Sequence, residues 1–162
     1  MDIHSTDPPR RDPSRRRASA RSLADSLPEL LRLHAPRMLV VEDDRELRPI
    51  VRRAAASMQP AVAVDWCASV EHARRLLRLR YYDVVLADYQ LEGDAAGLAL
   101  RSDCWELQPQ AVFAMTSAYP LIEYLHSVGG PGCPFLQKPF DLWTCRRFVS
   151  SLLGRDDARS GR

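Results

Sequence analysis

Five short apolar runs alternate with longer amphipathic stretches along most of this chain, and this alternation limits the folds open to it. The runs cover residues 38–41, 61–67, 83–88, 111–116 and 135–137, and a stretch with helical periodicity follows each of them. Strands that alternate with helices of about ten to fifteen residues predict a parallel sheet with helices on both faces. Five such units, joined by right-handed crossovers, favour a flavodoxin-like (βα)5 doubly wound parallel sheet with strand order 2-1-3-4-5.

The five predicted helices have recognisable starts and ends. They cover residues 45–57, 69–77, 97–108, 120–128 and 141–153. Ser69 opens the second helix and Asp141 is the expected N-cap of the last one. Pro109 stops the third helix, and the pair Gly129-Gly130 closes the fourth. We expect the three tryptophans, Trp66, Trp105 and Trp143, to pack against the body of this domain.

The sequence predicts three parts of different character. Residues 1–36 are rich in Arg and Pro, so we expect a basic, mostly disordered extension. A capping box at Ser26–Glu29 and a row of leucines predict a short amphipathic helix near 27–33, which would dock on the body or on a partner. Residues 37–154 form the globular domain, and residues 155–162 form a frayed tail.

Charge and cysteine usage exclude several classes of protein. Residues 1–37 hold eight arginines against five acids, whereas residues 38–162 hold fifteen basic residues against sixteen acids. The body is nearly neutral, so we expect no nucleic-acid partner, although the run 15–17 could contact phosphates instead of being a solvated tail. The four cysteines form no CxxC pair, and no apolar run approaches the roughly 20 residues that span a bilayer. We therefore expect a soluble cytoplasmic protein with reduced thiols and no membrane contact.

Polar side chains with potential chemistry stand where four of the predicted strands end. The carboxyl ends of parallel strands share one edge of the sheet, where open α/β folds bind ligands. Asp88 ends the most apolar run, and by itself it could be either a loop cap or a reactive group. The residues at the four strand ends are Glu42-Asp43, Asp88, Thr116-Ser117 and Lys138-Pro139.

These residues together predict a cation site beside a lone ammonium group. Three carboxylates at one edge would repel each other, and a divalent ion would relieve the repulsion. Hard oxygen ligands with room for water suit Mg²⁺ better than zinc or calcium. Lys138 is the single lysine among 23 basic residues, so it is either an accident of composition or a point-charge partner for phosphate or carboxylate. The hydroxyl of Thr116 could donate to an oxygen of Asp88.

Residues 38–153 resemble a response regulator receiver domain of two-component signalling, of the stand-alone, single-domain type. Four separate motifs carry the resemblance in order, with 45 residues from Asp43 to Asp88, 28 from there to Thr116 and 22 more to Lys138. Leu91-Glu92 and Ser117 differ from the residues that are common in the family. The motifs are Val40-Val41-Glu42-Asp43-Asp44, Asp83-Val-Val-Leu-Ala-Asp88-Tyr-Gln-Leu91, Met115-Thr116-Ser117 and Phe135-Leu-Gln-Lys138-Pro139-Phe140.

The resemblance implies a phosphoacceptor that is not an enzyme but assists its own phosphorylation and dephosphorylation. Asp88 would take a phosphoryl group from a histidine kinase or a histidine phosphotransfer protein. Glu42, Asp43, Asp88 and the backbone carbonyl of Gln90 would hold Mg²⁺. Lys138 would pair with the phosphoryl group, and its bond to the following proline would be cis.

The resemblance also implies a conformational output. Thr116 and Phe135 would be the switch residues, and they would bias a face made of the fourth helix, fifth strand and fifth helix. Through this face the protein would dock on a downstream protein target or form a homodimer. Two alternatives remain open. A haloacid-dehalogenase-type phosphatase would want a second carboxylate where Gln90 stands, and a pseudo-receiver would keep the fold without being phosphorylated.

Overall fold

The computed structural model describes residues 35–91, 96–120 and 133–155. The chain divides into two compact units, Met1–His34 and Ala35–Arg162, and all the described residues belong to the second. The helix predicted near 27–33 lies outside the described residues, as do the helix predicted over 120–128, apart from its first residue, and most of the predicted tail.

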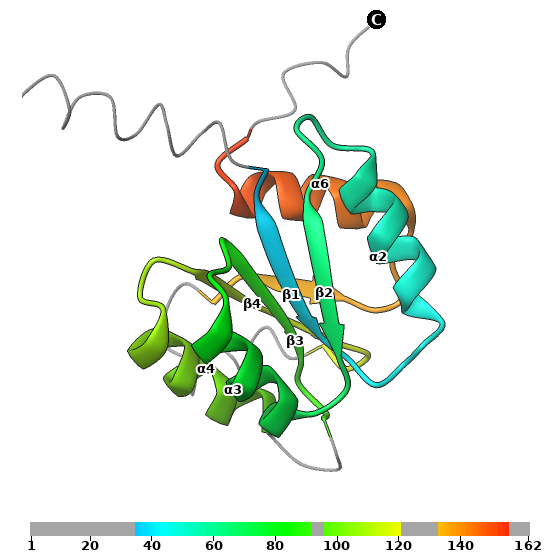
Figure 1. The fold of residues 1–162 in the computed structure, drawn as a ribbon. Coiled ribbons are helices and arrows are strands. Elements are labelled where there is room, and N and C mark those ends of the chain that lie inside the picture. Colours follow the sequence, from blue (N-terminus) through cyan, green and yellow to red (C-terminus); the bar gives the residue numbers. More distant parts are fainter. Residues whose placement is uncertain (1–34, 92–95, 121–132, 156–162) are drawn as a thin grey trace, which may run out of the picture. The chain divides into compact units, whose positions relative to one another are not determined.

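Five parallel strands form one sheet in the order β2-β1-β3-β4-β5 (Figure 1). The central strand β3 is buried along its whole length, which explains why its sequence is an unbroken apolar run. The predicted fold class and strand order are confirmed. The strands are β1 (Arg37–Val41), β2 (Ala63–Cys67), β3 (Val84–Asp88), β4 (Val112–Ser117) and β5 (Phe135–Gln137).

Helices cover both faces of the sheet. The helices are α2 (Leu47–Ala56), α3 (Val70–Leu79), α4 (Ala96–Leu107) and α6 (Leu142–Leu152). The pair α2 and α6 packs on one face, and the pair α3 and α4 packs on the other (Figure 1). Side chains of a strand alternate between the two faces, so β1 sends Met38 and Val40 into one core and Leu39 and Val41 into the other.

Two predicted helix starts are visible as side-chain caps. The Ser69 side chain accepts a hydrogen bond from the backbone N–H of His72 at 3.3 Å, at the start of α3. The Asp141 carboxylate accepts from the backbone N–H of Thr144 at 2.7 Å, at the start of α6. Each cap satisfies an N–H group that the helix itself leaves without a partner.

The side chains of Gln108 and Asp65 hold the segment that leads into β3 through hydrogen bonds and ion pairs. Gln108 is buried, and its amide nitrogen donates to two carbonyls at the end of α3, both at 2.6 Å. Its amide oxygen accepts from the backbone N–H of Tyr82 at 2.9 Å. Asp65 of β2 accepts from the hydroxyl of Tyr82 at 2.9 Å and also pairs with Arg37 and Arg80. These bonds join the end of α3 to the sheet.

The prediction for the tryptophans is wrong at two of three positions. Trp105 is 68% exposed and Trp143 is 63% exposed. Trp66 is partly buried against the core on the α2 side, and the Arg48 guanidinium lies 5.9 Å from its ring centroid. Within the described part of the chain, every helix is too short or too polar to cross a membrane.

Candidate functional site

The pairing of the strands brings the predicted site residues to one edge of the sheet. Val41 at the end of β1 is in register with Ala87 of β3, so the residues that follow them, Glu42 and Asp88, are neighbours. Asp88 is in turn in register with Thr116 of β4. One carboxylate oxygen from each of Glu42, Asp43 and Asp88 lies within 4.8 Å of the other two. Residues far apart in sequence therefore meet because the backbone ladder aligns their strands.

Lys138 completes this cluster from the end of β5. Its ammonium Nζ lies 2.6 Å from Oε2 of Glu42 and 3.1 Å from Oδ2 of Asp88. The three side chains are only 14%, 2% and 9% exposed, respectively. The backbone N–H of Lys138 donates to the carbonyl of Ser117 at 2.8 Å, which fixes the lysine beside the end of β4. One cation thus serves two largely buried carboxylates.

Burial and neighbouring charges both shift the pKa values of this cluster. Burial raises the pKa of Glu42 above its ordinary value, and the nearby charge of Asp88 adds to the rise against the opposing effect of Lys138. Burial on its own would lower the pKa of Lys138, but its contacts with Glu42 and Asp88 outweigh burial and raise that pKa. The rise for Lys138 therefore reflects its two carboxylate neighbours, whereas the rise for Glu42 comes first from desolvation of the buried carboxylate.

The donor set fits a hard divalent cation. Asp43 is exposed while Glu42 and Asp88 are buried, so the cluster is open to solvent on the Asp43 side. Gln90 is also exposed, two residues beyond Asp88 on the turn that follows β3. Three carboxylates with an open side suit Mg²⁺, which keeps several waters and prefers oxygen ligands.

The two predicted switch residues lie on the neighbouring strands β4 and β5, both on the same side of β3. Thr116 is 2% exposed, and its hydroxyl has no hydrogen-bond partner among the described residues. The expected bond from this hydroxyl to Asp88 is therefore absent, and that expectation is wrong for this conformation. Phe135 begins β5, in register with Met115, and is partly buried. The Lys138–Pro139 bond is cis, as expected.

Sequence reasoning missed two residues that shape the site. The side-chain amide of Gln137, at the end of β5, donates to the carbonyls of Ala118 at 2.8 Å and Lys138 at 3.0 Å. Nothing in a single sequence marks such a long-range contact from an exposed glutamine. Gly97, in the first turn of α4, lies so close to Asp88 that an added Cβ would overlap the backbone oxygen of that aspartate. Glycine is disfavoured inside helices, so a glycine in the first turn of a predicted helix could have indicated a close approach of the backbone to another group.

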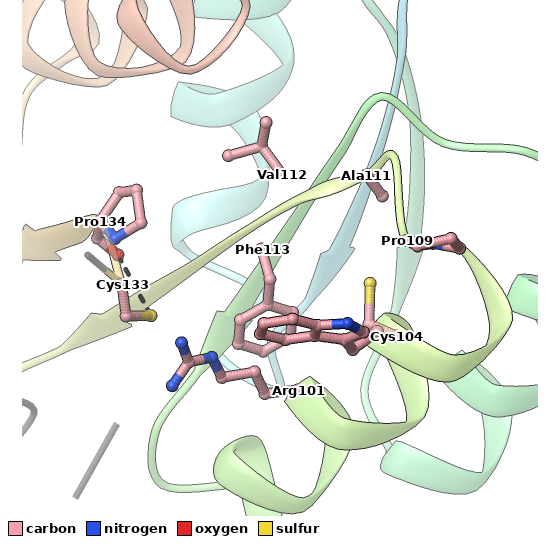
Figure 2. Close-up of a pocket in the computed structure, with 9 residues that line it drawn as sticks. Arg101, Cys104, Pro109, Ala111, Val112, Phe113, Cys133 and Pro134 are labelled. Atoms are coloured by element: carbon pink, nitrogen blue, oxygen red, sulfur yellow. Dashed lines mark hydrogen bonds between the residues drawn. The ribbon is translucent and has the colours of Figure 1, made fainter. Parts of the chain in front are cut away.

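A separate hollow of about 240 Å³ lies beside α4 and the first half of β4 (Figure 2). Its lining is mostly apolar, with Arg101 as its charged side chain, and it includes no member of the acidic cluster. The acidic edge of the sheet is therefore the candidate functional site, because charged groups of opposite sign converge there. The hollow is lined by Arg101, Cys104, Trp105, Pro109, Ala111, Val112, Phe113, Cys133 and Pro134.

Comparison of the sequence alone identifies no relative: no protein-family model matches the chain, and no curated protein matches it. Comparison of the fold finds similar solved structures. A response regulator from Thermotoga maritima matches with a TM-score of 0.64 and 24% identity, over 75% of this chain and 99% of that one. A CheY-like receiver domain protein from Methanospirillum hungatei JF-1 matches with a TM-score of 0.64 and 16% identity, over 75% and 95% of the two chains.

A third similar structure was solved in a modified state. It is a response regulator protein from Burkholderia pseudomallei with a phosphorylated aspartic acid, a calcium ion and citrate. It matches with a TM-score of 0.60 and 20% identity, over 72% of this chain and 66% of that one. From the strand order and these likenesses, the described chain has the fold of response regulator receiver domains.

Proposed function

We propose that this chain is a phosphoacceptor switch of a two-component phosphorelay, with Asp88 as the residue that is phosphorylated. One observation carries the proposal. The Asp88 carboxylate lies 3.1 Å from the Lys138 ammonium and within 4.8 Å of two further carboxylates, at the edge of the sheet where ligands bind. A carboxylate that only capped a loop would need neither a buried ammonium nor two acidic neighbours.

The reaction needs positioning and charge neutralisation more than covalent chemistry from the protein. An oxygen of Asp88 forms a bond to phosphorus while the nitrogen–phosphorus bond of a phosphohistidine breaks, and the imidazole leaves with the electron pair. Lys138 already lies beside Asp88, where it can neutralise an incoming phosphoryl oxygen. Glu42, Asp43, Asp88 and the backbone carbonyl of Gln90 would hold Mg²⁺, which would supply further positive charge to the phosphoryl group.

The proposed output is conformational. A phosphoryl group on Asp88 would offer an acceptor to the Thr116 hydroxyl, which is buried without a partner among the described residues. Movement of Thr116 and Phe135 would then alter the face that includes β5 and α6. We propose that this face docks on a downstream protein or on a second copy of the chain. The phosphoryl donor would be a histidine kinase or a histidine phosphotransfer protein, and the chain would act in the cytoplasm as a signalling protein, not an enzyme.

Chemical phosphorylation tests this proposal directly. The full chain is incubated with acetyl phosphate and Mg²⁺, and its intact mass is measured over time. We expect a gain of one phosphoryl group, and no gain in the Asp88→Asn variant or when EDTA removes the metal. Glu106→Gln, an exposed acid on α4, is the matched control and should be phosphorylated normally. An unchanged mass of the wild-type protein would instead favour a pseudo-receiver that binds partners without phosphorylation.

A further inference from the structure

Gln137 joins the two loops that carry the proposed phosphorylation chemistry. It ends β5, and its amide nitrogen Nε2 lies 2.8 Å from the carbonyl oxygen of Ala118, 3.0 Å from that of Lys138 and 3.3 Å from that of Ser117. The Ser117 carbonyl belongs to the end of β4 and the Ala118 carbonyl to the loop after it. The Lys138 carbonyl belongs to the loop after β5. An amide nitrogen carries two hydrogens, so the three contacts share them.

Backbone pairing anchors the end of β4 to β3, where the Thr116 carbonyl accepts from the backbone N–H of Tyr89 at 2.8 Å, but side chains of the described residues add little on that side. Thr116 makes no side-chain hydrogen bond among the described residues, although its hydroxyl is buried. The Ser117 hydroxyl accepts from the backbone N–H of Tyr119 at 3.1 Å, a bond within the loop itself. Toward β5, the described residues tie this segment through the Gln137 amide and the backbone bond from Lys138 N–H to the Ser117 carbonyl at 2.8 Å.

We propose that Gln137 is a positioning residue that holds the loop after β4 in its unphosphorylated arrangement and so opposes the switch. This inference rests on the proposed phosphorylation of Asp88. When a phosphoryl group attracts the Thr116 hydroxyl, the end of β4 shifts toward Asp88, its register partner. That shift draws the Ser117 and Ala118 carbonyls away from the Gln137 amide, so these bonds stabilise one state and not the other.

The size of the effect follows from the bonds that are lost. A net hydrogen bond in water changes an equilibrium by about two- to tenfold. Because Gln137 is exposed and its contacts share two hydrogens, we expect its removal to favour the switched state by about three- to tenfold.

The test uses fluoroberyllate, which imitates a phosphoryl group on an aspartate. The full chain is titrated with fluoroberyllate at saturating Mg²⁺, and binding is followed by the backbone amide signals in ¹H–¹⁵N NMR spectra. Gln137→Met keeps the length of the side chain but removes both donor hydrogens, and Gln137→Ala is a second variant whose side chain carries no donor. Gln110→Met makes the same change at an exposed glutamine before β4, away from the site.

We expect Gln137→Met to bind fluoroberyllate about three- to tenfold more tightly than wild type, with Gln110→Met unchanged. In the free Gln137→Met protein, the amide signals of Ala118 and Tyr119 should move part of the way toward their bound positions, which a merely structural role would not produce. Equal or weaker binding in both Gln137 variants, without those shifts, would overturn the inference and leave the proposed function standing. If the wild-type protein itself bound no fluoroberyllate, the inference and the proposed function would both fail.

Discussion

Replacing Asp43 with asparagine should make the metal-free protein more stable, although it removes a proposed ligand. Asp43 contributes the third carboxylate to a cluster in which Lys138 already contacts the other two, at 2.6 and 3.1 Å. Asparagine keeps the shape of the side chain and removes its negative charge. The change therefore isolates the repulsion that the cluster carries when no cation is bound.

The distances set the magnitude. Two like charges 4.8 Å apart, the upper limit within the cluster, repel by about 0.9 kcal/mol in water and about 3.5 kcal/mol at an effective dielectric constant of about 20. Asp43 is exposed, so solvent screening places each interaction near the lower value. Attraction to Lys138 offsets part of the sum over Glu42 and Asp88. We expect Asp43→Asn to raise the free energy of unfolding by about 1 kcal/mol in the absence of metal.

Magnesium should reverse this order of stability. A ligand that binds only the folded state stabilises it, by about 2.7 kcal/mol at a concentration one hundred times its dissociation constant. The wild-type protein should gain that stability, whereas Asp43→Asn, with one carboxylate fewer, should gain far less. Urea unfolding in EDTA and again in excess Mg²⁺ measures both quantities, and urea, being uncharged, does not screen the repulsion.

Asp44→Asn is the matched control, because it removes the same charge one residue outside the cluster. Asp44 is exposed and accepts from the backbone N–H of Glu46 at 2.8 Å, a bond that an amide oxygen can keep. Its stability should change little, and its response to Mg²⁺ should match that of the wild type. The reasoning is refuted if Asp43→Asn is less stable than wild type in EDTA, or if Mg²⁺ stabilises the variant and the wild type equally.

Three further predictions concern the supports of the fold and site. Gln108→Leu should lower the free energy of unfolding in urea by about 2–4 kcal/mol, because three backbone groups lose their partner in a buried position; a change below 0.5 kcal/mol would contradict this. Hydrogen bonds and ion pairs overcome the effect of burial and lower the pKa of Asp65, so its contribution to stability is present above its ordinary pKa and disappears as the pH falls through the folded value. Asp65→Asn should thus cost about 1–2 kcal/mol at pH 7 and progressively less below about pH 4, and a cost that did not depend on pH would exclude this explanation. Gly97→Ala should lower stability by about 1–3 kcal/mol and slow labelling of Asp88 by acetyl phosphate, since its Cβ would overlap the Asp88 carbonyl; unaltered labelling would show that the backbone yields without disturbing the site.

The fold could be predicted from the sequence because local patterns and topology agree. The run at Val84–Asp88 is apolar at almost every position, as a strand buried on both faces requires, and the caps at Ser69 and Asp141 lie where the sequence placed them. Exposure of large side chains was less predictable. Trp105 and Trp143 lie on helices whose inner faces are already filled, and a tryptophan carries no local signal of the direction in which it points.

The members of the candidate site could be named from the sequence, whereas their bonding could not. Residues at the ends of parallel strands must share one edge, so the meeting of Glu42, Asp88 and Lys138 follows from strand order alone. Which partner each side chain takes depends on rotamers and on distances of a few tenths of an ångström. Thr116 therefore lacks the bond expected for it, and Gln137 makes contacts that no spacing in the sequence indicates.

Two unsatisfied features at this edge of the sheet, a surplus of carboxylates and a buried hydroxyl without an acceptor, argue together for a metal ion and a phosphoryl group as ligands. A salt bridge that served stability alone would need one acid for Lys138, but three carboxylates gather there, and the surplus negative charge opposes folding until a cation binds. The buried Thr116 hydroxyl has no acceptor among the described residues, which also opposes folding until an acceptor arrives. On the proposed function, a metal ion would neutralise the surplus charge and a phosphoryl group on Asp88 would supply the missing acceptor. A chain that bound neither would gain stability from an amide at Asp43 and from valine at Thr116, and the presence of both polar groups is what the phosphoacceptor proposal explains.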